Sequence, residues 1–512
     1  MDNSSNNKRI AKNTLALYVR MLFTVIVGLY TSRVVIQTLG VEDYGIYGVV
    51  GGIVSMMVFL NSSMSGATSR FITFELGRGD AKRLSDTFSS AMVVHILIAL
   101  IIVVLAETVG LWFLCNKLVI PENRMLAAHL VYQFSVFSVV FGVTQVPYNS
   151  SIIAHEKMDV YAYVEILNVV LKLLIVYMLL IGDFDKLILY AALMLAVSLF
   201  IMMVYRIYCI RHFEECRFHW IWNKEYIYPM LSFSGWNLYY EGAFAVRQQG
   251  ANILLNMFCG LVYNAASGIA TTVQGVVMGF SANTTVSFRP QIIKAYASQN
   301  YDNMNRLIRL GTKFACVLIL AFTIPLIFKL NYILALWLGD VPEGAVFMLQ
   351  CLLIVNVINT SSVLLVVGIQ STGRLKLYSG LCGSLYLLSV GIMYVMMLLH
   401  YDYRAIYSVI LGTAFVVNLA YAIILKKQMT AFAFIEYYIE VILPVVIISI
   451  LAVVSLLYVR CYFADTLISL FFFVLFSVIW ISIMSFYIVL GKSERRYVID
   501  LVNNKILKRI FR

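Results

Sequence analysis

The stretch from 232 to 258 is long and apolar enough to cross a bilayer, yet it carries polar side chains in or near its middle. These are Glu241, Arg247, Gln248, Gln249, Asn252 and Asn256. An ionisable side chain at the centre of a membrane costs at least about 2.5 kcal/mol, so it usually faces a water-filled cavity, a partner or a polar substrate. An arginine at this depth can bind an anion, and a carboxylate can bind a proton or a cation. We therefore expect this span to contribute to a binding site.

One face of the predicted helix is polar from end to end. At about 100° per residue, a single arc of about 100° contains a polar stripe. The stripe consists of Asn237, Glu241, Gln248, Asn252 and Asn256. Arg247 points roughly 120° away from Glu241, so the two cannot pair as residues four apart would. Each needs a partner elsewhere, unless Gly242 or Gly250 breaks the helix.

The composition of the chain places this span in an integral membrane protein. Charged residues are 12% of the 512 residues and apolar residues are 62%, whereas soluble proteins contain about 25% charged residues. With about 20 apolar residues per crossing, the sequence predicts an all-α membrane protein with about fourteen transmembrane helices. The predicted spans are 13–37, 44–68, 88–114, 127–153, 161–181, 187–208, 230–256, 265–288, 307–329, 344–368, 377–399, 405–425, 438–458 and 466–490.

Basic residues between the predicted spans indicate the orientation. The eight alternate segments that begin with the N-terminus hold 25 Lys and Arg residues, and the seven intervening loops hold five. Because basic loops stay on the cytoplasmic side, both termini are expected there. The formal charge of +12 is explained by this bias, since the inner leaflet is anionic. It indicates membrane lipids as partners and no nucleic acid.

An internal repeat is the strongest architectural clue. In the first copy Arg70 follows Gly40 by 30 residues, and in the second copy Arg289 follows Gly260 by 29. Each copy has six spans, an even number, so both copies enter the membrane in the same direction. Two such lobes place a substrate cavity between them and move it by rocking, which is alternating access.

The predicted organisation has five parts. They are an N-terminal lobe (1–208), a cytoplasmic connector (209–229), a C-terminal lobe (230–425), two extra spans (426–490) and a cytoplasmic amphipathic tail (491–512). Apolar residues recur at helical spacing in the tail among seven basic residues. We expect the tail to lie along the inner leaflet, with docking to a partner as the alternative.

Several blocks of sequence around the seventh span resemble a known family. They are FSGWNL at 233–238, QGANILLNMF at 249–258, YNAASGIA at 263–270 and RPQIIKAYA at 289–297, with LGVEDYGIYGVV at 39–50. These blocks resemble the polysaccharide transporter family, the Wzx-type flippases of lipid-linked oligosaccharides. That family shares a superfamily with the MATE-type multidrug exporters and the peptidoglycan lipid flippase. The resemblance implies a MATE-like fold of two six-helix lobes with two added helices.

The resemblance also implies a function. It indicates movement of an undecaprenyl-diphosphate-linked oligosaccharide from the cytoplasmic to the periplasmic leaflet of a bacterial inner membrane, for O-antigen or capsule synthesis. A polysaccharide polymerase and other assembly proteins are implied as partners, and no cofactor is implied. Such a transporter needs fixed cations for the diphosphate, and Arg and Lys supply charge-assisted hydrogen bonds.

The candidate substrate-binding residues are Arg247, Lys172, Arg33, Asn237, Gln248, Asn252, Trp236 and Tyr240. Lys172 lies near the centre of the fifth span, too deep for its side chain to reach the interface readily. Arg33 is closer to the outer end, where snorkelling is an equal alternative. The two aromatic residues offer sugar stacking, with packing or an interfacial position as the alternative. Arg20, near the inner end, is interpreted as an anchor.

Glu241 is the candidate for a coupling ion, H⁺ or Na⁺. Its alternative role is to neutralise Lys172 or Arg247. Glu165 lies nearer to a span end and is not assigned a function. No catalytic residue is predicted.

A cluster in the connector has the residue types of a zinc site. Its spacing is C-x2-H-x3-C-x2-H, formed by Cys209, His212, Cys216 and His219. This is not one of the usual zinc-finger spacings, and the loop is short. We therefore prefer a basic connector and predict no metal.

Two other function classes remain open. A MATE-type exporter of organic cations would need an excess of intramembrane acids, whereas the deep charges here are Lys172 and Arg247 against Glu241. A membrane enzyme of polysaccharide assembly would usually carry a sizeable outer loop, and every predicted outer loop is about 14 residues or shorter. No nucleophile, metal or phosphate-loop motif stands in a suitable place.

Overall fold

The computed structural model describes residues 3–116, 120–179, 184–491 and 494–495. Within them, the side chains of Leu261 and of some residues between 3 and 63, among them Arg33, lie outside the described set. Every regular element in the described part of the chain is a helix, which confirms the all-α prediction.

The longest helices of the first half are α1 (Asn3–Arg78), α2 (Ala81–Leu105), α4 (Met125–Ala154), α5 (Met158–Met178), α6 (Lys186–His212) and α7 (Lys224–Cys259), with the short α3 (Leu111–Asn116) after α2. The second half contains α8 (Leu261–Ala297), α9 (Tyr301–Phe328), α10 (Leu330–Leu338), α11 (Ala345–Thr360), α12 (Val363–Thr372), α13 (Lys376–Leu398), α14 (Arg404–Gln428), α15 (Phe434–Tyr437), α16 (Leu443–Val459) and α17 (Leu467–Ile488).

Nine of the described helices are long and apolar enough to cross a membrane, or ten if α11 and α12 form one span bent by 42°. Each of these ten corresponds to one predicted span. The other four predicted spans lie in α1, α7 and α8, which have 76, 36 and 37 residues. All three are long enough to cross. Polar side chains lower the mean hydropathy of α7 and α8, and α1 contains many side chains outside the described set.

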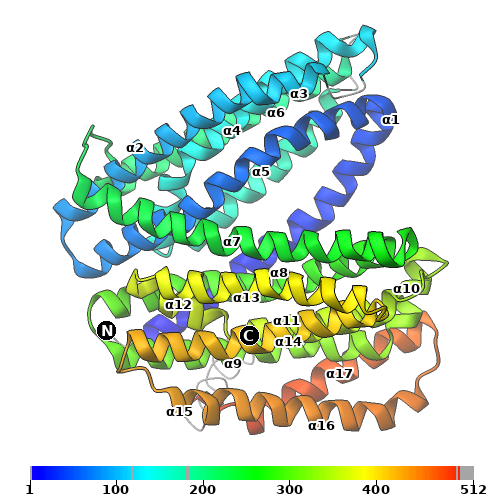
Figure 1. Ribbon diagram of the computed structural model, residues 1–512. Coiled ribbons are helices and arrows are strands. Elements are labelled where there is room, and N and C mark those ends of the chain that lie inside the picture. The colour runs from blue at the N-terminus through cyan, green and yellow to red at the C-terminus, as the bar shows by residue number, and fades with distance from the viewer. Residues whose placement is uncertain (1–2, 117–119, 180–183, 492–493, 496–512) are drawn as a thin grey trace, which may run out of the picture. The chain divides into compact units, whose positions relative to one another are not determined.

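Glycines in a left-handed conformation separate the first two helices of each predicted copy of the repeat. Gly40 interrupts α1 with φ 81° and ψ 163°, and it turns one long helical segment into two (Figure 1). Gly260 separates α7 from α8 with φ 91°. Glycine accepts positive φ because it has no Cβ atom. The two glycines from which the repeat was inferred therefore have the same backbone role.

By its internal contacts the chain divides into two compact units. The first unit comprises residues 1–238 and 293–299, and the second comprises 239–292 and 300–512. The first thus includes the connector, the first turns of α7 and the last residues of α8.

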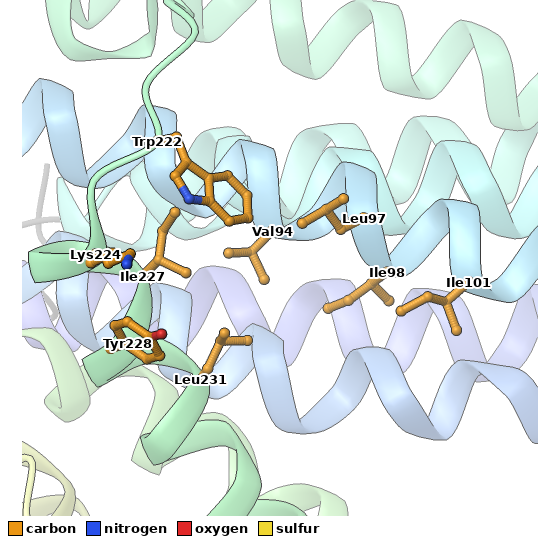
Figure 2. Close-up of a pocket in the computed structure, with 9 residues that line it drawn as sticks. All are labelled: Val94, Leu97, Ile98, Ile101, Trp222, Lys224, Ile227, Tyr228 and Leu231. Carbon is orange, nitrogen blue, oxygen red and sulfur yellow. The ribbon is translucent and has the colours of Figure 1, made fainter.

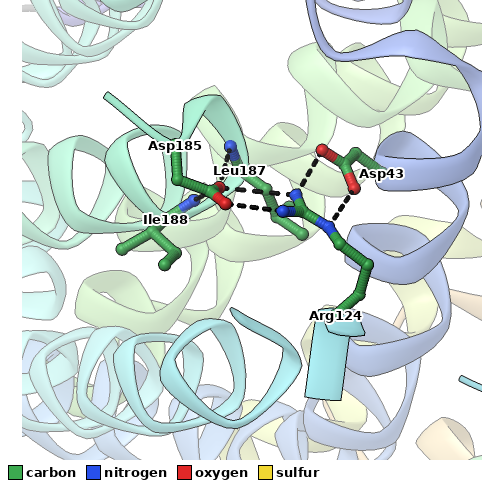
Figure 3. Close-up of polar contacts among 5 residues, drawn as sticks. All are labelled: Asp43, Arg124, Asp185, Leu187 and Ile188. Carbon is green, nitrogen blue, oxygen red and sulfur yellow. Dashed lines mark hydrogen bonds and ion pairs between the residues drawn. The ribbon is translucent and has the colours of Figure 1, made fainter. Parts of the chain in front are cut away.

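In the first unit, a single arginine joins three helices (Figure 3). The Nε and Nη2 atoms of Arg124, just before α4, donate to the two carboxylate oxygens of Asp43 in α1 at 2.9 and 2.5 Å. Its Nη1 atom donates to Asp185 at 2.5 Å. Asp185 also caps the start of α6, since its Oδ1 accepts from the backbone N–H groups of Leu187 and Ile188 at 3.1 Å. All three loops are predicted to be periplasmic, and we call this ion-pair set the loop clamp.

In the second unit, the two extra helices α16 and α17 pack against α9 (Figure 1). Their shared core includes Leu320, Ile448 and Phe473. Two buried lysines, one in the middle of α9 and one directly after it, strengthen this contact. Lys313 pairs with Glu494 at 3.2 Å, and Lys329 pairs with Asp465 at 2.7 Å.

The predicted amphipathic tail, 491–512, lies outside the described residues except for 491, 494 and 495. Its expected position on the inner leaflet stays a prediction.

Candidate functional site

The helix that carries the polar stripe, α7, is continuous from Lys224 to Cys259. It does not break at Gly242 or Gly250, so the stripe remains on one helical face. Gly250 has a packing role, because a Cβ atom there would lie 3.1 Å from Val390 of α13. Gly383 of α13 similarly makes room for the ring of Tyr239, which a Cβ atom would meet at 2.7 Å. Small residues at these two places let α7 and α13 approach closely.

Four tyrosines meet where α7, α13 and α14 pack together in the second unit. The hydroxyl groups of Tyr240 and Tyr421 lie 2.7 Å apart, and that of Tyr386 lies 3.5 and 3.4 Å from them. The ring of Tyr378 lies 4.7 Å from that of Tyr240, between centroids. Tyr378, Tyr386 and Tyr421 are each 5% exposed or less. We call this group the tyrosine cluster.

Arg247 lies at the edge of the tyrosine cluster. Its guanidinium carbon is 4.8 Å from the ring centroid of Phe244 and 5.2 Å from that of Tyr386, both cation–π distances. The residue is only 6% exposed, and its Nε atom has no hydrogen-bond partner among the described residues. The one side-chain hydrogen bond found for it there is long, 3.5 Å from Nη2 to Gln248.

No carboxylate whose side chain the structure describes pairs with Arg247. The buried positive charge is therefore balanced only by aromatic faces and one amide. A buried charge with an open hydrogen-bond donor is expensive unless an anion meets it, so this guanidinium is suited to bind one.

The polar stripe divides into residues with and without partners. Asn252 accepts a hydrogen bond from Ser267 of α8 at 3.0 Å, and Tyr407 of α14 donates to the same serine at 3.0 Å. Asn237 is buried, whereas Asn256 at the other end is exposed. Glu241 is half-buried and makes no ion pair with any described side chain. Glu241 therefore does not neutralise Arg247, which was one of the alternative roles expected from the sequence.

The remaining predicted site residues lie elsewhere. Trp236 is half-buried at the end of the first unit, and Tyr240 belongs to the tyrosine cluster. Lys172 on α5 is half-buried, and its ammonium group has no hydrogen bond or ion pair among the described side chains. The side chain of Arg33 is outside the described set.

A second polar cluster, which the sequence did not reveal, lies inside the first unit. Arg20 of α1 stands over the ring of Tyr161 on α5 at 5.0 Å. The hydroxyl of the fully buried Tyr205 on α6 donates to Glu165 at 3.2 Å. Tyr161 and Glu165 are four residues apart on α5 and therefore share a helical face, so a cation and an anion belong to one cluster. We call these four residues the charged cluster.

The internal repeat is the feature of the sequence from which the charged cluster could have been found. Tyr205 and Tyr421 occupy corresponding places in the last helix of each copy, as do Tyr161 and Tyr378 in the helix before it. Comparison of the two copies position by position, rather than each span alone, would have identified both clusters.

Three of the four residues with zinc-ligand spacing contact groups outside that set. Cys209 contacts the carbonyl oxygen of Tyr148 at 3.5 Å, and His212 is bonded to the carbonyl of Tyr208 at 2.8 Å. His219 Nε2 lies 3.1 Å from Asp86. In the described part of the chain, no group of three His, Cys, Asp or Glu residues is arranged to hold a metal.

Comparison with known proteins places this geometry in a family. The sequence profile of the polysaccharide biosynthesis protein family matches residues 10–288. No curated protein matches the chain.

Solved structures of MATE transporters have the same fold. A multidrug resistance MATE family transporter of the MOP superfamily, in an outward-facing conformation, superposes with a TM-score of 0.71 at 13% identity, covering 84% of this chain and 97% of its own. A MOP superfamily transporter from Pyrococcus furiosus, described by the reverse polarity of its binding pocket, superposes with a TM-score of 0.67 at 14% identity, covering 83% of this chain and 96% of its own. The predicted MATE-like fold is confirmed.

Proposed function

The chain belongs to the polysaccharide biosynthesis protein family, and from this membership we propose that it moves an undecaprenyl-diphosphate-linked oligosaccharide from the cytoplasmic to the periplasmic leaflet. Family and fold together make it a membrane transporter in polysaccharide biosynthesis. The proposal adds the chemical nature of the cargo, its direction, and a bacterial inner membrane with both termini in the cytoplasm.

The buried guanidinium of Arg247 is the observation that carries the proposal. It is 6% exposed, it has an open Nε donor, and it lacks a carboxylate partner among the described side chains. Lys172, which also lies within a predicted span, likewise has no ion-pair partner among the described side chains. An excess of deep positive charge suits a diphosphate and opposes an organic cation.

The site residues of the proposal keep their predicted roles. Arg247 and Lys172 meet the diphosphate, while Gln248 and Asn252 offer amide groups to sugar hydroxyls. Glu241 is proposed to take up the coupling proton or sodium ion, because it is half-buried without a described cation partner. Arg33, Asn237, Trp236 and Tyr240 remain candidate contacts. A polysaccharide polymerase is the proposed assembly partner, and no enzymatic step is assigned to this chain.

Complementation tests the proposal. A strain that lacks its oligosaccharide flippase should regain surface polysaccharide when it expresses this chain with a matching cargo pathway. Arg247→Ala should abolish that rescue at normal membrane abundance, and Arg374→Ala, which changes an exposed arginine of the same unit, should not. Rescue by the Arg247 variant would exclude the proposed contact.

A MATE-type exporter of cations is the second candidate, favoured by the fold of the solved transporters. It predicts the opposite outcome. The chain would then raise resistance to cationic drugs without restoring polysaccharide, and Glu241 rather than Arg247 would be indispensable.

A further inference from the structure

An apolar groove of about 300 Å³ runs along α2 in the first unit (Figure 2). One wall is the face of α2 that carries Leu97 and Ile101, and the other is formed by Trp222, Tyr228 and Leu231 at the end of the connector and the start of α7. These five side chains are 37–62% exposed. Since α2 is one of the helices that can cross a membrane, this exposed apolar surface is suited to contact lipid.

The groove changes in polarity along its length. Lys224 and Trp222 lie at one end, and Ile101 lies at the other (Figure 2). Lys224 is exposed, and no acidic side chain in the described ranges forms an ion pair with it. The amphipathic rings of Trp222 and Tyr228 are typical of the membrane–water interface. An occupant that fits has an anionic end at Lys224 and a hydrocarbon body along α2.

The connector wall of the groove is fixed in place. His219 approaches two side chains of α2, with Nδ1 3.0 Å from the Ser89 hydroxyl and Nε2 3.1 Å from Asp86. Further back, the carboxylate of Glu215 lies 2.5 Å from His155 Nε2. These bonds hold the connector beside α2, so the groove is formed before any lipid enters it, and less ordering is needed on binding.

We propose that this groove binds an anionic phospholipid of the leaflet that surrounds the start of α7, with one acyl chain along α2 and the phosphate at Lys224. Basic sites between transmembrane helices on the cytoplasmic side recognise anionic headgroups in this way. The groove lies wholly within the first unit, and none of its lining residues belongs to the polar stripe. The inference is therefore independent of the cargo assigned above.

Lipid retention measures the headgroup contact. The full-length protein is reconstituted in bilayer discs of equal parts phosphatidylglycerol and phosphatidylcholine, and the lipids that remain bound are counted by native mass spectrometry. One lysine near the membrane surface should favour the anionic lipid about fivefold. Lys224→Gln should remove this preference, whereas Lys376→Gln, which changes the exposed lysine that opens α13, should keep it.

A second variant tests the chain-binding part of the groove. Leu97→Trp fills the groove with a bulky apolar side chain that the membrane tolerates, so one bound lipid should be lost whatever its headgroup. An unchanged lipid count in this variant, or an unchanged preference in Lys224→Gln, would overturn the proposal. Displacement of phosphatidylglycerol by a tenfold smaller amount of undecaprenyl phosphate would also overturn it, because the occupant would then be a polyprenyl chain.

Discussion

The charged cluster of the first unit and the tyrosine cluster of the second occupy corresponding places in the repeat, but they balance charge differently. The paired positions are Arg20 and Tyr240, Tyr161 and Tyr378, and Tyr205 and Tyr421, which lie 220, 217 and 216 residues apart. At the place of Glu165 the second copy has Cys382, 217 residues later.

The first unit therefore holds a cation and an anion together, whereas the second holds neutral tyrosines and an added guanidinium, Arg247. Balanced charges stabilise each other and are unavailable to a ligand, and an unbalanced charge is available. We therefore propose a structural role for the charged cluster and a binding role for the edge of the tyrosine cluster.

The largest expected effect is the loss of transport in Arg247→Ala. A charge-assisted hydrogen bond to phosphate contributes about 2 kcal/mol, so the transport rate should fall roughly thirtyfold. Thermal stability in detergent should not fall, because the variant removes a charge that has no described counter-ion. Flipping assays in proteoliposomes with a labelled lipid-linked sugar measure the transport rate, and a melting curve in detergent measures the thermal stability. A variant that transports normally but melts early would reverse the roles assigned to the two clusters.

Stability should respond most to Glu165→Gln. It removes the negative charge to which the buried Tyr205 hydroxyl donates at 3.2 Å, and a hydrogen bond to a charged group contributes about 2 kcal/mol. The melting temperature should drop clearly. Glu241→Gln is the matched control, since Glu241 has no described cation partner, and it should melt like the wild type while changing the dependence of transport on pH or sodium. Equal melting temperatures of the two variants would contradict the structural role of the charged cluster.

Removal of single hydroxyl groups should distinguish the two clusters by smaller changes in the free energy of unfolding. Tyr205→Phe deletes a hydrogen bond to a carboxylate and should lower the free energy of unfolding by about 2 kcal/mol. Tyr421→Phe deletes a bond between neutral hydroxyls and should lower it by about 1 kcal/mol. Denaturant titrations of both variants measure the difference. The reverse order would contradict a stronger hydrogen bond at Tyr205 than at Tyr421.

The smallest effect concerns pH and the loop clamp. Burial favours the neutral acid of Asp185, but hydrogen bonds from Arg124 and from the backbone of Ile188 and Leu187 outweigh it and lower its pKa. A lowered native pKa adds stability above the unfolded pKa of about 3.9, and that stability is lost as pH falls through the native value.

Asp185→Asn keeps the helix cap and removes only the charge. It should cost about 1 kcal/mol or less at neutral pH, because the pair is partly exposed, and less at pH 2, where the charge of Asp185 contributes less stability. Melting curves at the two pH values test this. An equal loss of stability at both pH values would mean that packing rather than charge holds the loops together.

Much of the fold was predictable because membrane crossing is a local requirement. Twenty apolar residues in a row predict a span without knowledge of its neighbours, and ten predicted spans have matching apolar helices. The repeat was also readable, since Gly40 and Gly260 must both adopt positive φ for their helices to turn.

The candidate site was predictable only in part. Hydropathy marked Arg247 and Glu241 because a charge in an apolar run stands out. It did not mark Tyr161, Tyr205 or Tyr421, because a tyrosine is ordinary in a membrane helix. Glu165 was overlooked since it lies nearer to a span end.

The sequence by itself determined that this chain crosses the membrane many times, that it repeats, and that one span carries charge. Each of these follows from the solvation of single segments or from their order. Tertiary structure decided which charges are balanced. Arg20 lies over Tyr161, which is four residues before Glu165 on α5, although Arg20 and Glu165 are 145 positions apart. Arg247 meets rings from α7 and α13 and no described carboxylate. Neutralisation depends on distances between helices, and helix packing alone sets those.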